Sequence, residues 1–279
     1  MDPAIVPLLR CPRTHTPLRL ERASYRDGRI WAGTLRSQAG AAWPIRAGIA
    51  DLIARPAALN GAQLVNRLPW AAWGYERLWR WRALSLLSGR PFGLAEEQAL
   101  VVEHIQPRPD GVYLDLACST GLYGRALARA LPAGRGLVVA LDHSAAMLRE
   151  TERYARADGV RLTLIRALAE ELPFADGAFA GVACGGSFNE FNNRDRVLSE
   201  ARRTLRPDGR TIWMQAQRAT SLAGRALQAA LSPGGVHFPP GEELARALQS
   251  AGLRVTLDQR EGAVQIIASH GRILPSPMP

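Results

Sequence analysis

The feature that most constrains the fold of this 279-residue chain is a strand, turn and helix unit that begins at residue 112. Residues 112–117 form an apolar run typical of a buried strand, residues 118–121 form a turn of small residues, and residues 122–131 have a helical pattern. A second apolar run follows at residues 137–142, and strand and helix patterns keep alternating after it. This alternation predicts an α/β domain with a doubly wound, mostly parallel sheet.

The turn and the end of the second strand predict a ligand site. A loop of small residues before a helix lets backbone N–H groups approach a ligand, and such sheets bind nucleotides at the carboxyl ends of their strands. Asp142 ends the second strand, where a carboxylate can accept hydrogen bonds from ribose hydroxyls. The same carboxylate could instead cap the following helix, and on this pattern alone a nicotinamide cofactor would fit equally well.

Four stretches taken together narrow the choice of ligand. Residues 114–121, 140–148, 169–179 and 198–209 resemble, in order and spacing, the motifs of class I S-adenosylmethionine-dependent methyltransferases, particularly the ubiquinone/menaquinone-type subgroup. The resemblance implies a seven-stranded, Rossmann-like methyltransferase domain over residues 111–272. It also implies S-adenosylmethionine as cofactor and S-adenosylhomocysteine as product.

The same resemblance implies a set of cofactor-binding residues. Asp115 and the loop 117–121 are expected to face the methionine part, and Asp142 the ribose. His143 and Met147 are expected to flank the adenine. The complete expected set is Tyr75, Asp115, Ala117, Cys118, Ser119, Thr120, Gly121, Asp142, His143, Met147, Leu168, Ala169, Glu170 and Cys184.

Some of these positions depart from the family or have a second interpretation. The family often has glycine where this chain has Ala117 and Ser119, and aspartate where it has Leu168. Each substitution reshapes the pocket, so a noncatalytic protein that binds the cofactor is one alternative function. Met147 is explained equally well as a core methionine, and Cys184 as a small buried hydrophobe rather than a nucleophile.

The acceptor side of the site is expected at residues 184–192, after the fourth strand of the domain. Asn189 and Glu190 could orient or deprotonate an acceptor there, although a solvated loop carboxylate is the competing interpretation of Glu190. His237 resembles a family position that borders the substrate space, where it could act as a general base or be a simple turn histidine. The motifs typical of enzymes that methylate exocyclic base amines or cytosine C5 are missing.

Residues 1–55 predict a small β-rich module. Residues 9–14 and 42–49 resemble the two ends of the zinc-ribbon-like modules that precede some methyltransferase domains, including one rRNA guanine methyltransferase family. Those modules use two Cys-x-x-Cys pairs, because tetrahedral zinc takes four soft ligands from two close turns. Only Cys11 remains here, and Thr14 stands where its partner would be, so we predict no metal.

Residues 56–110 predict helices that are unusually rich in tryptophan and arginine. Tyr75, Leu78, Trp79 and Arg82 recur at helical spacing, which predicts that this side packs against the protein while the guanidinium groups stay in water. Such a segment could be a docked helix, a lid over the active site or an interfacial surface. We favour the lid around Trp73, Tyr75 and Trp79, with Tyr75 nearest the cofactor, because the corresponding segment of resembling enzymes covers the methyl-transfer site.

Charge and composition bear on partners and location. The net charge of +10 comes from 35 basic residues, all of them arginine, and residues 1–100 hold 14 of these against seven acidic residues. A positively charged N-terminal part favours RNA as a possible partner. The three cysteines and the lack of a long apolar run or a signal-like start predict a cytoplasmic protein, and residues 273–279 predict a flexible tail.

Three functions follow from these observations. The favoured one is methyl transfer to a small-molecule acceptor of the quinone, lipid or secondary-metabolite type. The alternatives are methylation of an rRNA or tRNA base, and binding of the cofactor without turnover.

Overall fold

The computed structural model describes residues 1–54 and 59–271. Its strands are β1 (Leu18–Arg26), β2 (Arg29–Ser37), β3 (Ala42–Arg46), β4 (Ile49–Asp51), β5 (Val112–Leu116), β6 (Leu137–Asp142), β7 (Thr163–Arg166), β8 (Phe179–Gly185), β9 (Leu205–Ala216), β10 (Leu253–Glu261) and β11 (Val264–Gly271). Its helices are η1 (Pro3–Leu8), α1 (Gly61–Val65), α2 (Pro69–Gly74), η2 (Tyr75–Arg80), α3 (Trp81–Ser88), α4 (Leu94–Ile105), α5 (Leu122–Ala130), α6 (Ala145–Ala157), η3 (Ser187–Glu190), α7 (Arg194–Thr204), α8 (Leu222–Leu231), η4 (Ser232–Gly234) and α9 (Gly241–Ser250). The tail predicted at residues 273–279 lies outside the described residues.

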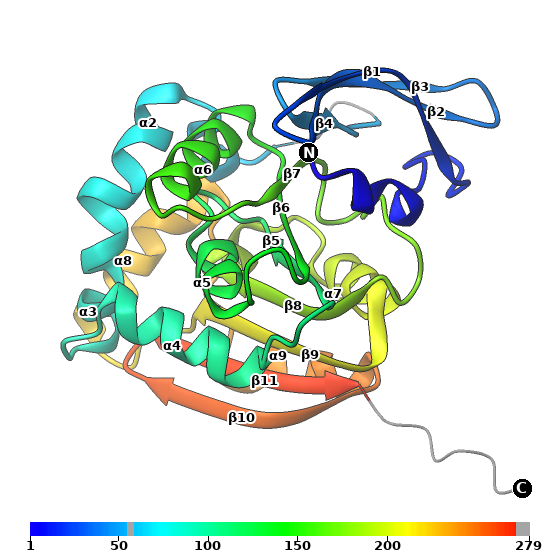
Figure 1. Cartoon of the computed structure of the whole chain (residues 1–279). Coiled ribbons are helices and arrows are strands. Elements are labelled where there is room, and N and C mark those ends of the chain that lie inside the picture. Colours follow the sequence, from blue (N-terminus) through cyan, green and yellow to red (C-terminus); the bar gives the residue numbers. More distant parts are fainter. Residues whose placement is uncertain (55–58, 272–279) are drawn as a thin grey trace, which may run out of the picture.

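The seven strands from β5 to β11 form the sheet that the sequence predicts. Their order is β7-β6-β5-β8-β9-β11-β10, with β5 to β9 parallel and β11 antiparallel to both neighbours. The chain winds outward in one direction from β5 through β6 to β7 and in the other from β8 onward (Figure 1). This confirms the doubly wound fold and puts its switch point between β5 and β8, where such sheets bind ligands.

Side chains that alternate along the strands belong to two apolar layers, one on each face of the sheet. Leu114 and Leu116 of β5 join the layer under α7 and α9. Tyr113 of the same strand joins the layer under α4, α5 and α6. Successive residues of a strand point to opposite faces of the sheet, and the helices on each side are amphipathic. Both faces of the sheet are therefore covered by apolar side chains.

The N-terminal strands extend this sheet rather than forming a separate body. β1, β2, β3 and β4 pair antiparallel in sequence order, and β4 then pairs in parallel with β7, with Ile49 opposite Leu164. An ion pair of 2.7 Å joins Asp51 to Arg166 across this seam. Ile5 and Leu9 are fully buried in the same apolar layer as Phe174 of the methyltransferase-like part. A shared ladder and a shared core therefore join the predicted module to the domain.

The segment predicted as helical at residues 56–110 divides into two parts. The helices α1, α2, η2 and α3 form a cap beside the carboxyl ends of the central strands (Figure 1). The longer α4 instead packs on α5 and on strands β8 and β9, and its Val101 and Ile105 are fully buried. α4 is thus one of the helices that cover the sheet.

Candidate cofactor site

The loop after β5 has the backbone shape of a glycine-rich loop without most of the glycines. Ala117, Ser119 and Gly121 have φ values of 52°, 53° and 77°, all in the left-handed region. Gly121 is required because a Cβ there would lie 2.5 Å from Thr151 Cγ2. A left-handed φ costs a residue with a Cβ about 1–2 kcal/mol, so Ala117 and Ser119 carry strain that glycine would not.

Asp142, at the end of β6, ties this loop to the next helix. Its Oδ2 accepts the N–H of Ser119 at 2.9 Å and its Oδ1 accepts the N–H of Ser144 at 2.8 Å. Burial raises the pKa of Asp142, while the neighbouring His143 and these N–H groups oppose the shift. Because each carboxylate oxygen has two lone pairs, Asp142 can hold the loop and still accept a hydrogen bond from a ligand hydroxyl.

A cavity of about 660 Å³ opens beside Asp142 at the carboxyl ends of β5, β6 and β7. Among the expected cofactor residues it is lined by Ala117, Asp142, His143, Leu168, Ala169 and Glu170. The wall also holds Phe191 and Asn192, which belong to the stretch 184–192 expected to form the acceptor side, and Gln63 from the cap, which the sequence analysis did not single out. The volume and the mixture of apolar and polar groups suit an adenosine.

A second cavity, on the other side of the loop, is almost closed. It measures about 10 Å³ and is lined by Tyr75, Asp115, Ala117, Cys118, Ser119 and Thr120 of the expected set, together with Arg80, Leu122, Tyr123 and Gly185. The first cavity therefore has room for a nucleoside, whereas the second holds no ligand group unless the cap shifts outward or Tyr75 turns.

The cap closes this second cavity through an irregular helical turn. η2 is a π-helix, whose i→i+5 hydrogen bonding brings residues five apart toward one face, and it aims both Tyr75 and Arg80 at the cavity. The helical spacing in the sequence predicted that Tyr75 and Leu78 would pack on one side while the guanidinium of Arg82 stayed in water. Tyr75 does face the cavity and Arg82 is exposed, but Leu78 is also exposed. The prediction for Leu78 was wrong because it assumed α-helical periodicity. The side chains of Trp79 and Trp81 lie outside those that the structure describes.

Two buried charge networks hold the cap against the domain. Arg80 pairs with Glu97 of α4, and the Tyr123 hydroxyl donates to the same Glu97 Oε1 at 2.6 Å. Glu76 accepts hydrogen bonds from Arg125 at 2.7 Å and from the Thr120 hydroxyl at 2.6 Å. Charged pairs removed from water in this way fix geometry, because losing either partner leaves a buried charge.

Asp115 joins the end of β5 to the first turn of α5. Its Oδ2 accepts the N–H of Gly124 at 2.6 Å, and burial raises its pKa to about 8. Met147 is fully buried and packs with Tyr75, while its sulfur accepts the Ser119 hydroxyl at 3.5 Å. Cys184 is fully buried, and burial raises its pKa. Met147 and Cys184 line neither cavity, which matches their interpretation as core residues.

The three expected catalytic residues lie on two loops: Asn189 and Glu190 follow β8, and His237 precedes α9. The Asn189 amide donates to the backbone oxygens of Ala216 and His237 and accepts the N–H of Ala216 at 2.7 Å, so its hydrogen bonds hold two loops together. The His237 side chain is exposed. Asn66 of the cap donates to Glu190 Oε2 at 2.9 Å. Burial and the charge of Asp142 raise the pKa of Glu190 to about 7, which is the range of a working general base.

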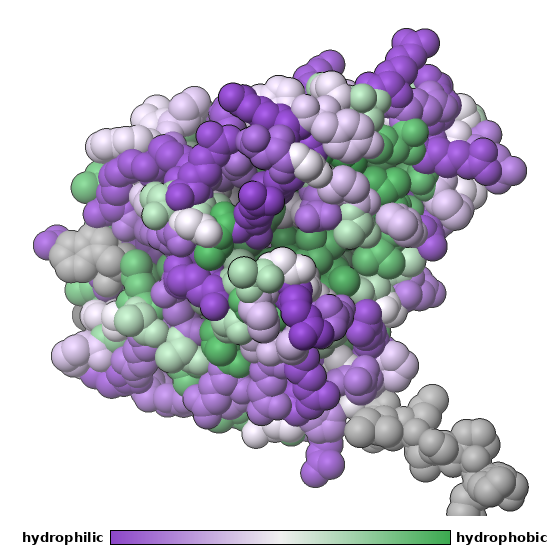
Figure 2. All heavy atoms as spheres, in the orientation of Figure 1, coloured by the Kyte–Doolittle hydropathy of each residue, from purple (hydrophilic) through white to green (hydrophobic). Residues whose placement is uncertain are grey.

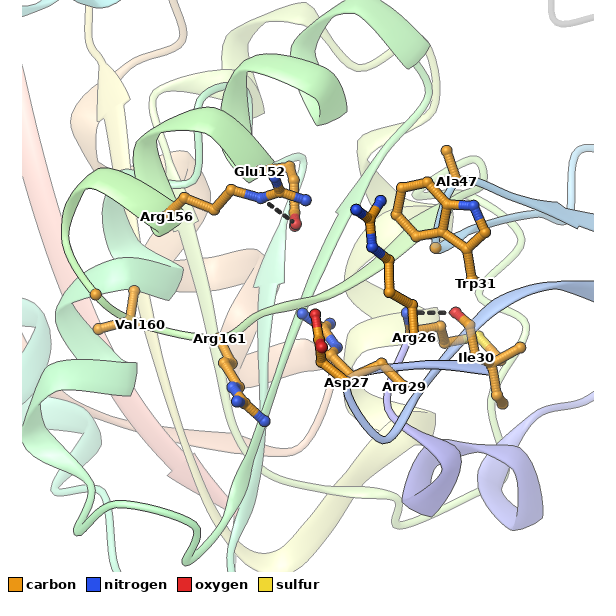
Figure 3. Close-up of a pocket in the computed structure, with 13 residues that line it drawn as sticks. Arg26, Asp27, Arg29, Ile30, Trp31, Ala47, Glu152, Arg156, Val160 and Arg161 are labelled. Carbon is orange, nitrogen blue, oxygen red and sulfur yellow. Dashed lines mark hydrogen bonds and ion pairs between the residues drawn. The ribbon is translucent and has the colours of Figure 1, made fainter. Parts of the chain in front are cut away.

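A cavity of about 320 Å³ lies elsewhere, between the β1–β2 turn and the carboxyl end of α6 (Figure 3). Arg26, Arg29, Arg156 and Arg161 line it. It adjoins the amino end of β7, the opposite edge of the sheet from the loop after β5, and is therefore no part of the cofactor site.

Cys11, between η1 and β1, is buried, and the nearby Thr14 shares a hydrogen bond with Thr16. In the described ranges, no group of three or more His, Cys, Asp or Glu side chains is placed to hold a metal ion. None of the described helices is long and apolar enough to cross a membrane.

Comparison with known proteins decides what kind of domain surrounds this site. Residues 114–209 match the family described as "Methyltransferase domain". The chain contains a class I methyltransferase domain. The match confirms the predicted class, whose cofactor is S-adenosylmethionine.

Relatives of this methyltransferase domain include a ubiquinone/menaquinone biosynthesis C-methyltransferase of Acidiphilium cryptum, 36% identical over 130 residues, which are 45% of this chain and 50% of the relative. A demethylmenaquinone methyltransferase of Thermus thermophilus is 31% identical over 152 residues, 54% of this chain and 59% of the relative. The chain thus spans about half the length of the curated relatives it matches.

Solved structures share the fold of the domain. A SAM-dependent methyltransferase from Aquifex aeolicus gives a TM-score of 0.55 at 17% identity, covering 74% of this chain and 99% of its own. A geranyl diphosphate C-methyltransferase from Streptomyces coelicolor gives 0.53 at 16% identity, covering 63% of this chain and 80% of its own.

Proposed function

We propose that the protein transfers a methyl group from S-adenosylmethionine to a small-molecule acceptor of the quinone type. The observation that carries the proposal is a pair of cavities that share Ala117, one lined by Asp142 and the other by Tyr75. Glu190, on the nearby loop after β8, accepts a hydrogen bond from Asn66 of the cap and has a pKa raised to about 7 by burial and by the charge of Asp142. The curated relatives described above are named as methyltransferases of ubiquinone and menaquinone biosynthesis, which supports this acceptor class.

The donor set suits each part of the cofactor. Asp142 can accept from the ribose hydroxyls, and Leu168 and Ala169 offer an apolar wall for the adenine. Arg80, a buried cation paired with Glu97, lines the second cavity, where a guanidinium can also donate hydrogen bonds to the carboxylate of the methionine part. When bound, S-adenosylmethionine supplies a methyl group on a positively charged sulfur.

The residues of the chain then contribute positioning, exclusion of water and movement of one proton. Tyr75 lines the second cavity, and an aromatic ring there can attract a cation. Closure of the cap excludes water and aligns the acceptor, which accounts for much of the rate in a displacement reaction. Glu190 accepts the proton that the acceptor loses, because its carboxylate form is well populated at neutral pH.

The test measures cofactor binding and turnover separately. Asp142→Ala should weaken binding of S-adenosylhomocysteine by about 1–3 kcal/mol in calorimetry, since it removes a ribose hydrogen bond. The matched control is Asp176→Ala, an exposed carboxylate outside both cavities, which should bind normally. Unchanged affinity in folded Asp142→Ala would refute the placement of the ribose.

Turnover is followed as transfer of a labelled methyl group to a demethylated quinol in detergent micelles. Binding of S-adenosylhomocysteine without any transfer would favour the noncatalytic alternative. The RNA alternative stays a prediction, and tight tRNA binding that falls steeply with salt would favour it, because each neutralised phosphate releases counterions.

A further inference from the structure

The outer surface of the cap collects nearly all of the exposed large apolar side chains. Ten such side chains occur among the described residues, and nine lie on only two segments. Seven are in the cap and two in α8: Leu64, Val65, Leu68, Trp70, Trp73, Leu78, Leu86, Leu222 and Leu231, which we call the apolar cap surface. The tenth, Tyr25, is on β1. A concentration of this kind marks an interaction surface, whereas scattered single exposures do not.

The two segments that form this surface meet in the structure. The Asn60 amide, which caps α1, donates to the backbone oxygen of Gly235 just after η4 at 3.4 Å, and Gly61 packs on Gly234. Figure 1 shows α8 at the same end of the molecule as α2 and α3. Figure 2, in the same orientation, shows apolar residues interspersed with polar ones along that edge.

The charges around the apolar cap surface have one sign. Arg67 and Arg82 of the cap and Arg225 of α8 are exposed. Residues 59–88 contain one acidic side chain, Glu76, which is held by Arg125, and residues 217–240 contain none. The surface therefore combines tryptophan and leucine with arginine, the composition of an element that lies on an anionic lipid surface.

We propose that the apolar cap surface binds an anionic lipid bilayer and that the acceptor enters the site from it. This rests on the proposed function, because a quinone-type acceptor is dissolved in lipid. A second copy of the chain is a poorer occupant. A two-fold interface would set the arginines of one copy against those of the other, with no exposed carboxylate from these segments to separate them.

The same helical segment has an inner and an outer face. Tyr75 and Arg80 point into the cofactor cavity, while Trp73 and Leu78, two residues away from them, are exposed on the outside. A bilayer that holds the outer face thus acts on the element that closes the inner cavity. The six-residue π-helix η2 and the short helix α2 before it carry side chains of both faces, so binding of the outer face to a bilayer is linked to opening of the inner cavity.

The experiment is vesicle flotation of the full chain with phosphatidylcholine alone and with added phosphatidylglycerol. The test variant is Trp70→Ser/Leu222→Ser, since these side chains are 69% and 79% exposed. The matched control is Tyr25→Ser, which is 58% exposed but lies outside the surface. We expect binding that requires phosphatidylglycerol and weakens with salt, a loss of about tenfold or more in the test variant, and no change in the control.

Absence of binding by the folded protein would overturn the proposal, and so would an equal loss in Tyr25→Ser. Analytical sedimentation provides a further test. A dimer that the double substitution dissociates would show that a second copy of the chain covers the surface, and this would also overturn the proposal. Calorimetry with S-adenosylhomocysteine on the same variants distinguishes failure of this proposal from failure of the proposed function. Weak vesicle binding with normal cofactor binding concerns the surface alone, whereas failure of the unsubstituted chain to bind cofactor rejects the function.

Discussion

Replacing Ala117 with glycine should stabilise the protein, although glycine usually destabilises. Ala117 sits at a φ of 52°, where a Cβ costs about 1–2 kcal/mol. The unfolded chain gains entropy with glycine, which offsets about 0.4–1 kcal/mol of the relief. The free energy of unfolding should therefore rise by about 0.5–1 kcal/mol. In a chain of this size class, each kcal/mol raises the thermal unfolding midpoint by about 2–4 °C.

The control for this substitution is Ala99→Gly. Ala99 is exposed in the interior of α4, where glycine should lower the free energy of unfolding by about 1 kcal/mol. Denaturant unfolding of both variants compares two identical chemical changes that should have opposite signs. If Ala117→Gly loses stability as Ala99→Gly does, the left-handed conformation of the loop, and the strain inferred from it, are wrong. Cofactor affinity should stay the same or rise, because Ala117 lines both cavities.

Three further predictions concern the site and the N-terminal strands. Glu190→Gln should lower kcat/KM by about 10²–10⁴ and remove its rise with pH through about 7. Because the pKa of Glu190 is raised on folding from 4.5, its contribution to stability is present below pH 4.5 and is lost as pH rises to about 7, so the glutamine variant should unfold with less pH dependence over that window. Hydrogen exchange at residues 66–90 should slow when S-adenosylhomocysteine binds, and equal protection with and without ligand would contradict a lid around Tyr75. Protein purified without added metal should contain well under one zinc per chain, and a stoichiometric content would refute the loss of the site at Cys11.

The regular parts of the domain could be predicted from the sequence because their local patterns agree with their burial. The predicted strand at residues 137–142 has the bounds of β6, and the run beginning at Val112 is one residue longer than β5. Buried parallel strands are continuous apolar runs, so no tertiary information is needed to find them.

The predictions that failed concern features that depend on contacts between residues far apart in the sequence. The π-helix at Tyr75 breaks the spacing on which the packing face was predicted, and the partner that fixes Arg80 is Glu97, on a different helix. The bonds of Asn189 to Ala216 and His237 join segments far apart in the chain, which no local pattern records. The richness in arginine and tryptophan of the cap was the one signal that could have directed attention to Arg80.

The pairing of β4 with β7 has a consequence for any attempt to work with the methyltransferase domain alone. In the full chain β7 has β6 on one side and β4 on the other, so its backbone N–H and C=O groups are satisfied on both sides. A fragment that began at residue 111 would leave β7 as an open sheet edge and would uncover Phe174 and the apolar layer around it. Open apolar edges recruit strands from other molecules. The N-terminal strands thus protect the edge of β7 and reduce self-association of the protein.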